Sequence, residues 1–241
     1  MSTVVPELPA EQRETVGDDL AGMGSFFIDP EGAAKRVPHK WFWVGPLIIL
    51  SIISIVAGLL RLPMTEHVLE TMPMPANSTP EQFQRGVQLS LTIQHIVVWL
   101  VPLIVVIVDV VTAAILLAMS SILALNAKFR SLFNLVAGCS LIQGVAAIAS
   151  VAILKAKGEV STVAELQPPL GLDIFMPEGS NKYLTALLAS FSIFEIWWLV
   201  MMVLVFSRAF RVSKAKAFIA VLPLVVLGVI FRLVGAAFTR T

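Results

Sequence analysis

Long apolar runs without charged residues constrain this chain more than any other feature of its sequence. The 241 residues are 57% hydrophobic and only 14% charged, and the mean hydropathy is +0.88. An ordinary soluble domain carries about 25% charged residues, and a soluble fold with this composition would expose a large apolar patch. A helix needs about 20 apolar residues to cross the bilayer core. The sequence therefore predicts an all-α, polytopic transmembrane bundle with about five spans.

The predicted spans follow the apolar runs and are separated by polar connections. They cover residues 42–60, 96–125, 132–154, 184–206 and 217–238, inside one transmembrane domain over 25–238. Residues 1–24 are rich in Glu, Asp and Pro, which favours a disordered tail. This tail lacks the basic start and short apolar stretch of a signal peptide, so the first span is expected to act as the targeting signal.

Local signals predict a short helix just before the first span. Asp29 is a good N-cap, and Pro30 suits the first helical position. The helix is expected to end near Val37, before a proline. With Phe26 and Phe27 on one side and basic residues nearby, we expect this segment to lie in the membrane interface as an anchor.

A capping signal predicts that the second span begins well outside the membrane. Thr79 is followed by a proline and then by Gln82, which completes a capping-box pattern. We expect one helix to run without a break from this point into the second span, with a kink at Pro102. Such a helix would be longer than a bilayer is thick, so part of it would stand in water or tilt. The first span is expected to end at Arg61.

The distribution of Lys and Arg predicts the orientation. Two short turns are purely basic, whereas the two long connections are mixed in sign, so the positive-inside rule places the N-terminus in the cytoplasm. The turn before the last span could also hold anionic lipid head groups, and the alternative is that it only controls topology. The head-group candidates are Arg208, Arg211, Lys214 and Lys216.

Ionisable residues inside the spans are the main candidates for a site. Asp109 and Glu195 fall near the middle of the second and fourth spans, and Arg232 lies nearer one end of the fifth. A charge at the bilayer centre costs about 2.5 to 3.5 kcal/mol, so such residues face the bundle interior, pair, or are protonated. Two carboxylates at one depth repel, so one would be neutral or both would share a cation.

Three interpretations of these carboxyls stay open. Asp109 or Glu195 pairs with Arg232 or bonds to a polar neighbour, or they form a proton or cation site, or they are protonated and functionally silent. The polar neighbours proposed for them are Thr112, Asn134, Ser140, Gln143 and Ser192.

Several classes of function lack support in the sequence. The net charge of +1 gives no basic excess for binding nucleic acid. There is no phosphate-binding glycine loop, nucleophile elbow or His/Cys cluster, so we expect no enzyme activity, cofactor or metal. Cys139 is the sole cysteine, which makes an internal disulfide impossible. It is expected to behave as a small buried apolar residue.

Three motifs together resemble the Yip (Ypt-interacting protein) domain family, in particular its prokaryotic branch. They are FIDPE at 27–31 before a tryptophan at 41, TPEQ at 79–82, and FSIFEIW at 191–197 followed by SKAKA at 213–217. The resemblance covers roughly residues 25–238 and implies five spans with a cytoplasmic N-terminus. Its eukaryotic members are Golgi and endoplasmic-reticulum proteins linked to Rab GTPases and vesicle traffic.

We therefore expect a non-catalytic, multi-pass protein that organises membrane or partner proteins. The alternatives are a small ion- or proton-coupled transporter or channel subunit that uses Asp109 and Glu195, and an intramembrane enzyme. The expected partners are membrane lipids and a membrane or cytoplasmic protein, and a homo-oligomer stays open. The expected location is the bacterial inner (cytoplasmic) membrane.

Overall fold

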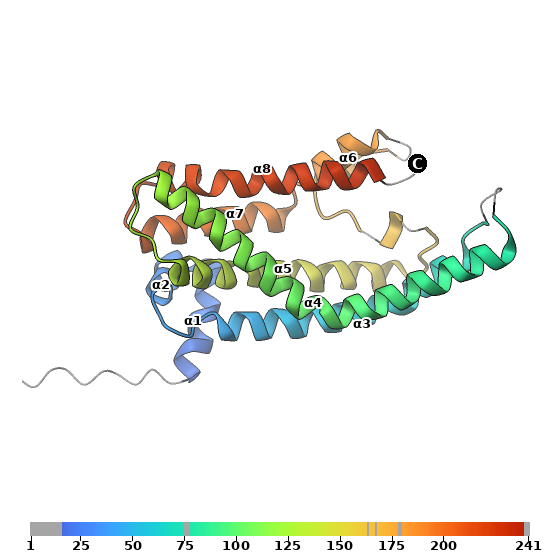
Figure 1. Cartoon of the computed structure of the whole chain (residues 1–241), viewed down its shortest axis with the longest axis horizontal. Helices are drawn as coiled ribbons and strands as arrows, with labels where there is room; N and C mark the ends of the chain where they lie inside the picture. Colours follow the sequence, from blue (N-terminus) through green and yellow to red (C-terminus); the bar gives the residue numbers. More distant parts are fainter. Residues whose placement is uncertain (1–15, 75–77, 163, 167, 178–179, 239–241) are drawn as a thin grey trace, which may run out of the picture.

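The computed structural model describes residues 16–74, 78–162, 164–166, 168–177 and 180–238, and these residues contain helices but no strand (Figure 1). Along the chain, two short helices come before the long helices of the bundle. The elements are α1 (Val16–Ile28), α2 (Pro30–Arg36), α3 (Val44–Thr71), α4 (Pro80–Ile122), α5 (Phe129–Lys157), η1 (Ala164–Leu166), η2 (Leu172–Phe175), α6 (Lys182–Ala189), α7 (Ile193–Ala209) and α8 (Lys214–Phe238).

The bundle is built around α5. In the most apolar 18-residue window of α5, 56% of the residues are buried, against 17% in each of α3, α4 and α8. α5 contacts α3, α4 and α7, and α8 packs against α4 and α7. α5 is thus the most buried of these four helices and forms the centre of the fold, whereas α3, α4 and α8 present most of their apolar surface outward, as expected in lipid.

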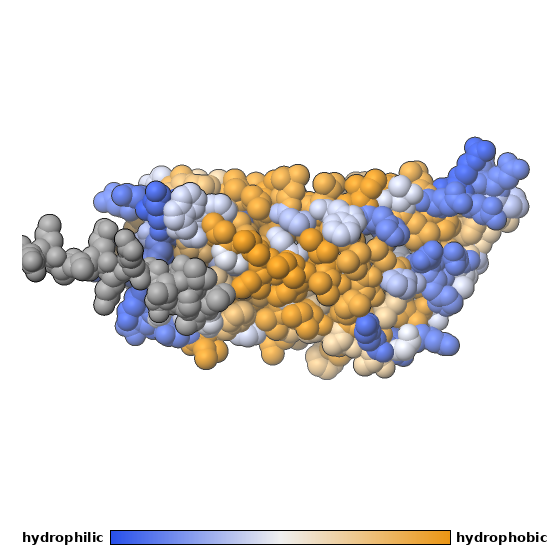
Figure 2. Space-filling view, turned by 90° about the horizontal axis from the view of Figure 1, so that it is seen from below, coloured by the Kyte–Doolittle hydropathy of each residue, from blue (hydrophilic) through white to orange (hydrophobic). Residues whose placement is uncertain are grey.

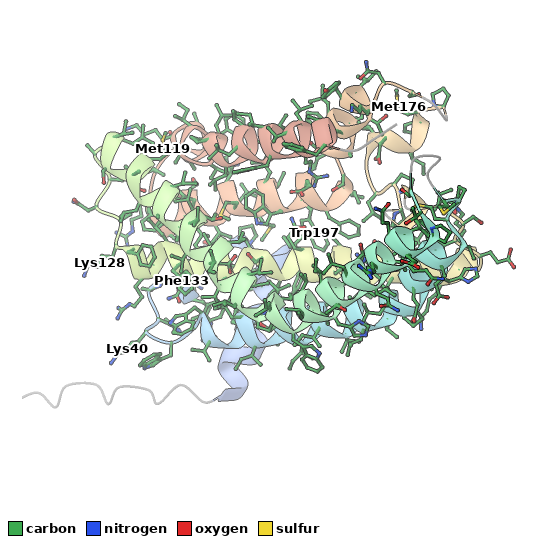
Figure 3. All side chains as sticks on the ribbon, turned by 45° about the vertical axis from the view of Figure 1, so that its right-hand side comes forward. Lys40, Met119, Lys128, Phe133, Met176 and Trp197 are labelled. Atoms are coloured by element: carbon green, nitrogen blue, oxygen red, sulfur yellow. The ribbon has the colours of Figure 1, made fainter. Side chains whose placement is uncertain are left out.

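The spans agree with the all-helical prediction. Among the described residues, four helices (α3, α4, α5 and α8) are long and apolar enough to cross a membrane, and the α6–α7 pair makes a fifth span when taken together. Figure 2 shows one face on which an apolar band lies between two polar ends. Figure 3 places Lys40 and Lys128 at the end of the bundle that carries α1 and α2, and Met176 at the opposite end.

The fourth span is broken, which the sequence did not predict. We expected one helix over 184–206, but α6 ends at Ala189 and α7 begins at Ile193, with a bend of 46° between them. Ser192 caps the new start, because its hydroxyl accepts a hydrogen bond from the backbone N–H of Glu195 at 3.1 Å. The break therefore puts a helix end beside Glu195.

The α3–α4 pair projects beyond the other helices at one end of the bundle (Figure 1). α4 has 43 residues, which corresponds to about 64 Å at 1.5 Å per residue. Its start has the predicted capping box, in which Thr79 and Gln82 exchange hydrogen bonds. The helix of the first span continues past Arg61, where the span is predicted to end, through Pro63 to Thr71, and it packs against α4.

The N-terminal segment is docked on the bundle. α2 begins as predicted, with the Asp29 side chain accepting from the N–H groups of Glu31 and Gly32. However, residues 16–24 were assigned to a disordered tail and are part of α1, while residues 1–15 lie outside the described part of the chain. Phe26 was expected at the membrane interface, yet it is fully buried and stacks on Phe42 with ring centroids 5.2 Å apart.

Candidate functional site

A cavity of about 300 Å³ lies between α4, α5, α7 and α8, within the transmembrane part of the bundle. It brings together both intramembrane carboxylates and the intramembrane arginine that the sequence singled out. The lining residues are Val108, Asp109, Thr112, Val136, Ser140, Gln143, Ser190, Phe191, Glu195, Ile196, Trp198, Leu199, Leu224, Val225, Gly228, Val229 and Arg232.

The helical pattern of α4 turns Asp109 into the bundle. Asp109 belongs to a stripe of buried residues that recurs every three or four positions, with Ala113, Leu116 and Ser120. Such a stripe marks the face of a helix that packs on its neighbours. Because most of the residues around it are exposed on the outer surface, this narrow stripe holds α4 against the rest of the bundle.

The carboxyl group of Asp109 is only half satisfied. Its Oδ1 accepts a hydrogen bond from the Ser140 hydroxyl on α5 at 2.8 Å. Its Oδ2 is buried and has no hydrogen-bond partner in the described part of the chain, while the residue as a whole is 3% exposed. Buried polar atoms are normally paired, so the unpartnered oxygen indicates an acceptor that can take a further donor.

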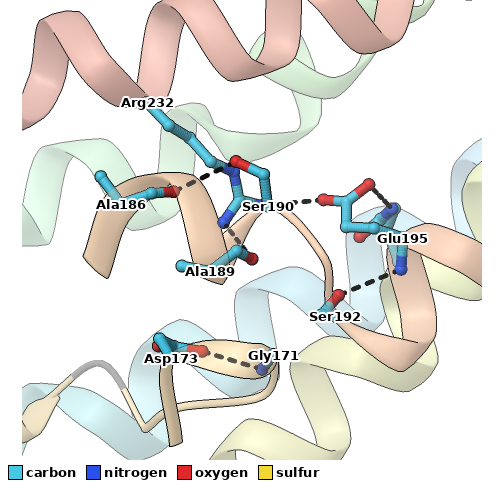
Figure 4. Close-up of polar contacts among 9 residues, drawn as sticks. Gly171, Asp173, Ala186, Ala189, Ser190, Ser192, Glu195 and Arg232 are labelled. Atoms are coloured by element: carbon cyan, nitrogen blue, oxygen red, sulfur yellow. Dashed lines mark hydrogen bonds and ion pairs between the residues drawn. The ribbon is translucent and has the colours of Figure 1, made fainter. Parts of the chain in front are cut away.

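Glu195 is paired with Arg232. Arg232 Nη2 lies 2.8 Å from Glu195 Oε1, and Arg232 Nη1 donates to the carbonyl oxygen of Ala189 at 3.0 Å (Figure 4). Gln143 on α5 donates to Glu195 Oε2 at 3.4 Å. Arg232 thus links the last turn of α6 to the first turn of α7, which holds the two halves of the broken span together.

The two carboxylates are held by two residues of α5 that lie about one helical turn apart. Ser140 bonds Asp109, and Gln143 bonds Glu195. Residues separated by three positions lie on one face of a helix, so α5 positions both groups toward the same cavity. This result matches the interpretation in which one carboxylate pairs with Arg232 and the other bonds a polar neighbour. The structure contains no group of three His, Cys, Asp or Glu side chains that could hold a metal ion, in the part of the chain it describes.

Asn134 does not belong to this cavity. Its Nδ2 donates to the carbonyl oxygens of Val37 and His39 at 2.9 and 2.5 Å, and its Oδ1 accepts from the backbone N–H of Trp43 at 3.1 Å. All three partners lie in the connection between α2 and α3. Asn134 therefore ties the N-terminal segment to α5, and its sequence interpretation as a partner for a carboxyl is corrected.

The four basic residues before the last span lie at the α1–α2 end of the bundle. Arg208 is in the last turn of α7, and Arg211, Lys214 and Lys216 follow in the turn and in the first residues of α8. All four are exposed. Arg211 has a φ of 54°, which lets the chain leave α7 and reverse toward α8. This set is separated from the cavity by more than two turns of α7 and α8.

Sequence reasoning missed the contacts that dock α1 and α2. The Phe26 ring lies against Gly138 of α5, where any added Cβ would overlap it. Trp197 of α7 donates through Nε1 to the carbonyl oxygen of Phe27 at 2.8 Å. The two phenylalanines and the glycine were visible in the sequence, but nothing in their spacing indicated that they meet.

The fold and its apolar surface define a multi-pass α-helical membrane protein. Among protein-family models, the Yip1 domain matches residues 23–235 of the sequence. Because this match covers most of the chain, the protein belongs to the Yip1 domain family, which is a non-catalytic family of membrane proteins. The family resemblance indicated by the three motifs is thus confirmed. No curated protein and no solved structure matches the sequence.

Proposed function

We propose that this protein organises partner proteins at the membrane surface, and that the docked N-terminal segment provides the binding surface. We call residues 16–43 the N-terminal platform. The observation that carries the proposal is that this platform is fixed to the bundle by contacts from two different helices, the buried Asn134 and Gly138 of α5 and the partly buried Trp197 of α7.

A fixed platform has a physical cost that a simple tether would avoid. Ordering the backbone costs about 1 to 2 kcal/mol per residue in conformational entropy. The platform offsets this cost with Phe26, which is fully buried, and with hydrogen bonds from Asn134 and Trp197. Its outer side still exposes large apolar groups, with Ile28 84% and Trp41 63% exposed. A preorganised surface of this kind favours binding because less entropy is lost on association.

Site-specific photo-crosslinking in cells tests the proposal. A benzophenone amino acid replaces Ile28 on the platform, and in a parallel strain it replaces Phe175 at the opposite end, which is 81% exposed. We expect one reproducible adduct from position 28 and none of the same mass from position 175. Mass spectrometry identifies the adduct and separates a different protein from a second copy of this chain.

The variant Gly138→Leu, which should displace the N-terminal platform from the bundle, supplies the structural control. Its side chain would overlap Phe26, whereas Gly86→Leu on α4 adds a side chain where nothing lies within 4 Å of the Cβ. We expect Gly138→Leu to reduce the position-28 adduct at least fivefold at equal protein level, and Gly86→Leu to leave it unchanged. An adduct that is equally strong in both variants would contradict a role for the docked platform.

The basic residues at the same end support a further part of the proposal, namely that this end holds anionic lipid head groups. Each Lys or Arg near an anionic surface contributes about 1 kcal/mol, and the four candidates are exposed. Replacing all four with Gln should lower the amount of anionic lipid that copurifies with the protein by about half. Replacement of Arg85, Lys155 and Lys157, which lie toward the other end, is the control. The four residues replaced in the test variant are Arg208, Arg211, Lys214 and Lys216.

The same basic bias supports a cytoplasmic N-terminus, and the resemblance to the prokaryotic branch supports a location in a bacterial cytoplasmic membrane. We assign the chain to the prokaryotic branch of the family on the FIDPE, TPEQ and FSIFEIW motifs. In this orientation the N-terminal platform and the basic turns all face the cytoplasm.

Ion- or proton-coupled transport is the second candidate, and the cavity with Asp109 and Glu195 favours it. Purified protein in sealed liposomes would then carry H⁺, Na⁺ or K⁺ faster than empty liposomes, and Asp109→Asn would abolish the excess flux. The organising role predicts fluxes equal to those of empty liposomes for all three ions.

A further inference from the structure

The cavity between α4, α5, α7 and α8 carries an uncompensated acceptor. Arg232 neutralises Glu195 at 2.8 Å, which leaves the carboxyl group of Asp109 as the remaining charged group of the lining. Its Oδ2 is buried and has no hydrogen-bond partner among the residues that the structure describes. Because unpaired charges inside a membrane are costly, this oxygen favours a ligand that brings a positive charge or a strong donor.

The rest of the lining is mostly apolar. Leu224 and Val225 of α8 and Leu199 of α7 line the cavity, as do the aromatic side chains of Trp198 on α7 and of Phe191 in the break between α6 and α7. Aromatic faces attract cations as well as apolar groups. The volume of about 300 Å³ is at the lower end of the range for small-molecule sites, about 300 to 1,000 Å³. These features suit a ligand with one charged group and a compact apolar body.

We propose that this cavity binds an organic ammonium ion, with its N–H groups donating to Asp109 and its apolar body packed against α7 and α8. The proposal is independent of the organising role of the platform. The ammonium can belong to a free lipophilic amine or to the head group of an aminophospholipid, and both present the same chemistry.

Other ligand classes fit the lining less well. An anionic ligand would approach the Asp109 carboxylate, while the Arg232 guanidinium is already engaged by Glu195 and the Ala189 carbonyl. A divalent metal ion prefers several oxygen ligands, and the described residues offer no cluster of three acidic, His or Cys side chains. A neutral alcohol could donate one hydrogen bond, but it would leave the carboxylate charge uncompensated.

Equilibrium dialysis tests the proposal with the full chain in phosphatidylcholine nanodiscs. The probe is radiolabelled n-octylamine, and empty nanodiscs give the background from partition into lipid. We expect saturable binding of one n-octylamine per chain above this background. Neither n-octanol nor octanoate, which have the same chain length without the positive charge, should show saturable binding.

Two variants with different mechanisms connect the binding to the cavity. Asp109→Asn keeps the shape and removes the charge, and it should weaken n-octylamine binding at least tenfold. Gly228→Leu keeps Asp109 and projects a side chain from the cavity wall, where nothing lies within 4 Å of an added Cβ. It should abolish binding. Gly235→Leu is the matched control on α8, because it also has open space around its Cβ but does not line the cavity.

Competition distinguishes the two sources of the ammonium group. If phosphatidylethanolamine in the nanodiscs weakens n-octylamine binding, the lipid head group is the occupant. If it has no effect, the occupant is a free amine. The proposal is overturned if n-octylamine shows no saturable binding, or if both Asp109→Asn and Gly228→Leu bind it as the unaltered protein does.

Discussion

At the scale of single residues, Asn134 makes three hydrogen bonds to the backbone of a distant segment. It is fully buried, and one side chain satisfies three backbone groups in the last part of the N-terminal platform, between α2 and α3. A backbone segment that crosses the end of a bundle has no helical partners for these groups, and leaving them buried and unpaired is costly. Asn134 supplies donors and an acceptor in the geometry that this segment needs.

Replacing Asn134 with Ala should therefore destabilise the protein. Each buried backbone group left without a partner costs about 1 to 3 kcal/mol, and entry of water would relieve part of the sum, so we expect a loss of about 3 kcal/mol. Unfolding in detergent, followed by circular dichroism against denaturant concentration, measures it. Asn126→Ala is the control, because Asn126 is exposed in the turn before α5. Equal stability of the two variants would contradict the bridging role.

Glu165 should make the stability of its loop, which lies outside the membrane-spanning helices, depend on pH. The backbone N–H of Ser161 donates to its Oε2 at 2.8 Å, and Lys157 Nζ lies 3.2 Å from its Oε1. These contacts hold the pKa of Glu165 below its usual value. A carboxyl whose pKa is lowered by folding stabilises the fold above the unfolded pKa of about 4.3 and loses this effect as pH falls through the folded pKa.

We expect the loop that contains Ser161 to lose hydrogen-exchange protection below about pH 4. The measurement is the protection factor of peptides from this loop by mass spectrometry, corrected for the intrinsic pH dependence of exchange. In Glu165→Gln the protection should be lower at neutral pH and change little with acidification. A loop whose protection falls with pH to the same extent in both proteins would rule out Glu165 as the cause.

At the scale of secondary-structure elements, the sequence predicts helix starts better than helix contacts. The Asp29 cap of α2 and the Thr79–Gln82 capping box of α4 are confirmed, because both depend on residues within one turn. The break between α6 and α7 was missed, since the capping residue Ser192 lies in a stretch that is mostly apolar on both sides and reads as one span. The docking of α1 was missed for a different reason: it depends on Phe26 meeting Gly138, more than a hundred positions away.

The candidate site was predicted in a similar, partial way. The cost of charge in lipid singled out Asp109, Glu195 and Arg232, and the structure brings all three to one cavity. Composition and spacing did not reveal which carboxylate pairs with the arginine, because that choice depends on the bend of the fourth span. The same limit explains the incorrect assignment of Asn134 to a carboxyl.

The ion pair across the broken span can be measured by a double-mutant cycle. Glu195→Gln or Arg232→Gln alone leaves one charge without its partner within the bundle, so each should destabilise the protein by about 2 kcal/mol. This figure is below that of a fully buried pair, because the two side chains are 32% and 42% exposed. The double variant should recover part of the loss. Unfolding in mixed micelles provides the four stabilities, and additive losses would mean that the two groups do not interact.

At the scale of the whole molecule, polar ends and an apolar middle fix its position in a bilayer. The N-terminal platform and the basic turns share one end, and the long connections with α6 share the other (Figures 1 and 3). The described helices supply four spans, or five when the bent pair is counted as one. With five spans, the two termini lie on opposite sides of the membrane.

Cysteine labelling in intact bacterial cells checks the predicted orientation. In a Cys139→Ser background, Gly24→Cys on the platform should resist a membrane-impermeant maleimide, while Gly86→Cys on the projecting part of α4 should react. Both positions have open space around the Cβ. After the cells are broken, both should react, which controls for accessibility. If Gly24→Cys reacts in intact cells and Gly86→Cys does not, the predicted orientation is wrong and the N-terminal platform lies outside.

The continuity of α4 has a mechanical consequence. Because one unbroken helix joins the projecting tip at Pro80 to Asp109 in the cavity wall, it can act as a lever about 44 Å long. Its natural pivot is Pro102, which cannot donate a hydrogen bond to the carbonyl of Val98 and so weakens the helix there. A protein that binds the projecting start of α4 could tilt the part of α4 that follows Pro102. It would thereby change the shape of the cavity without entering the lipid.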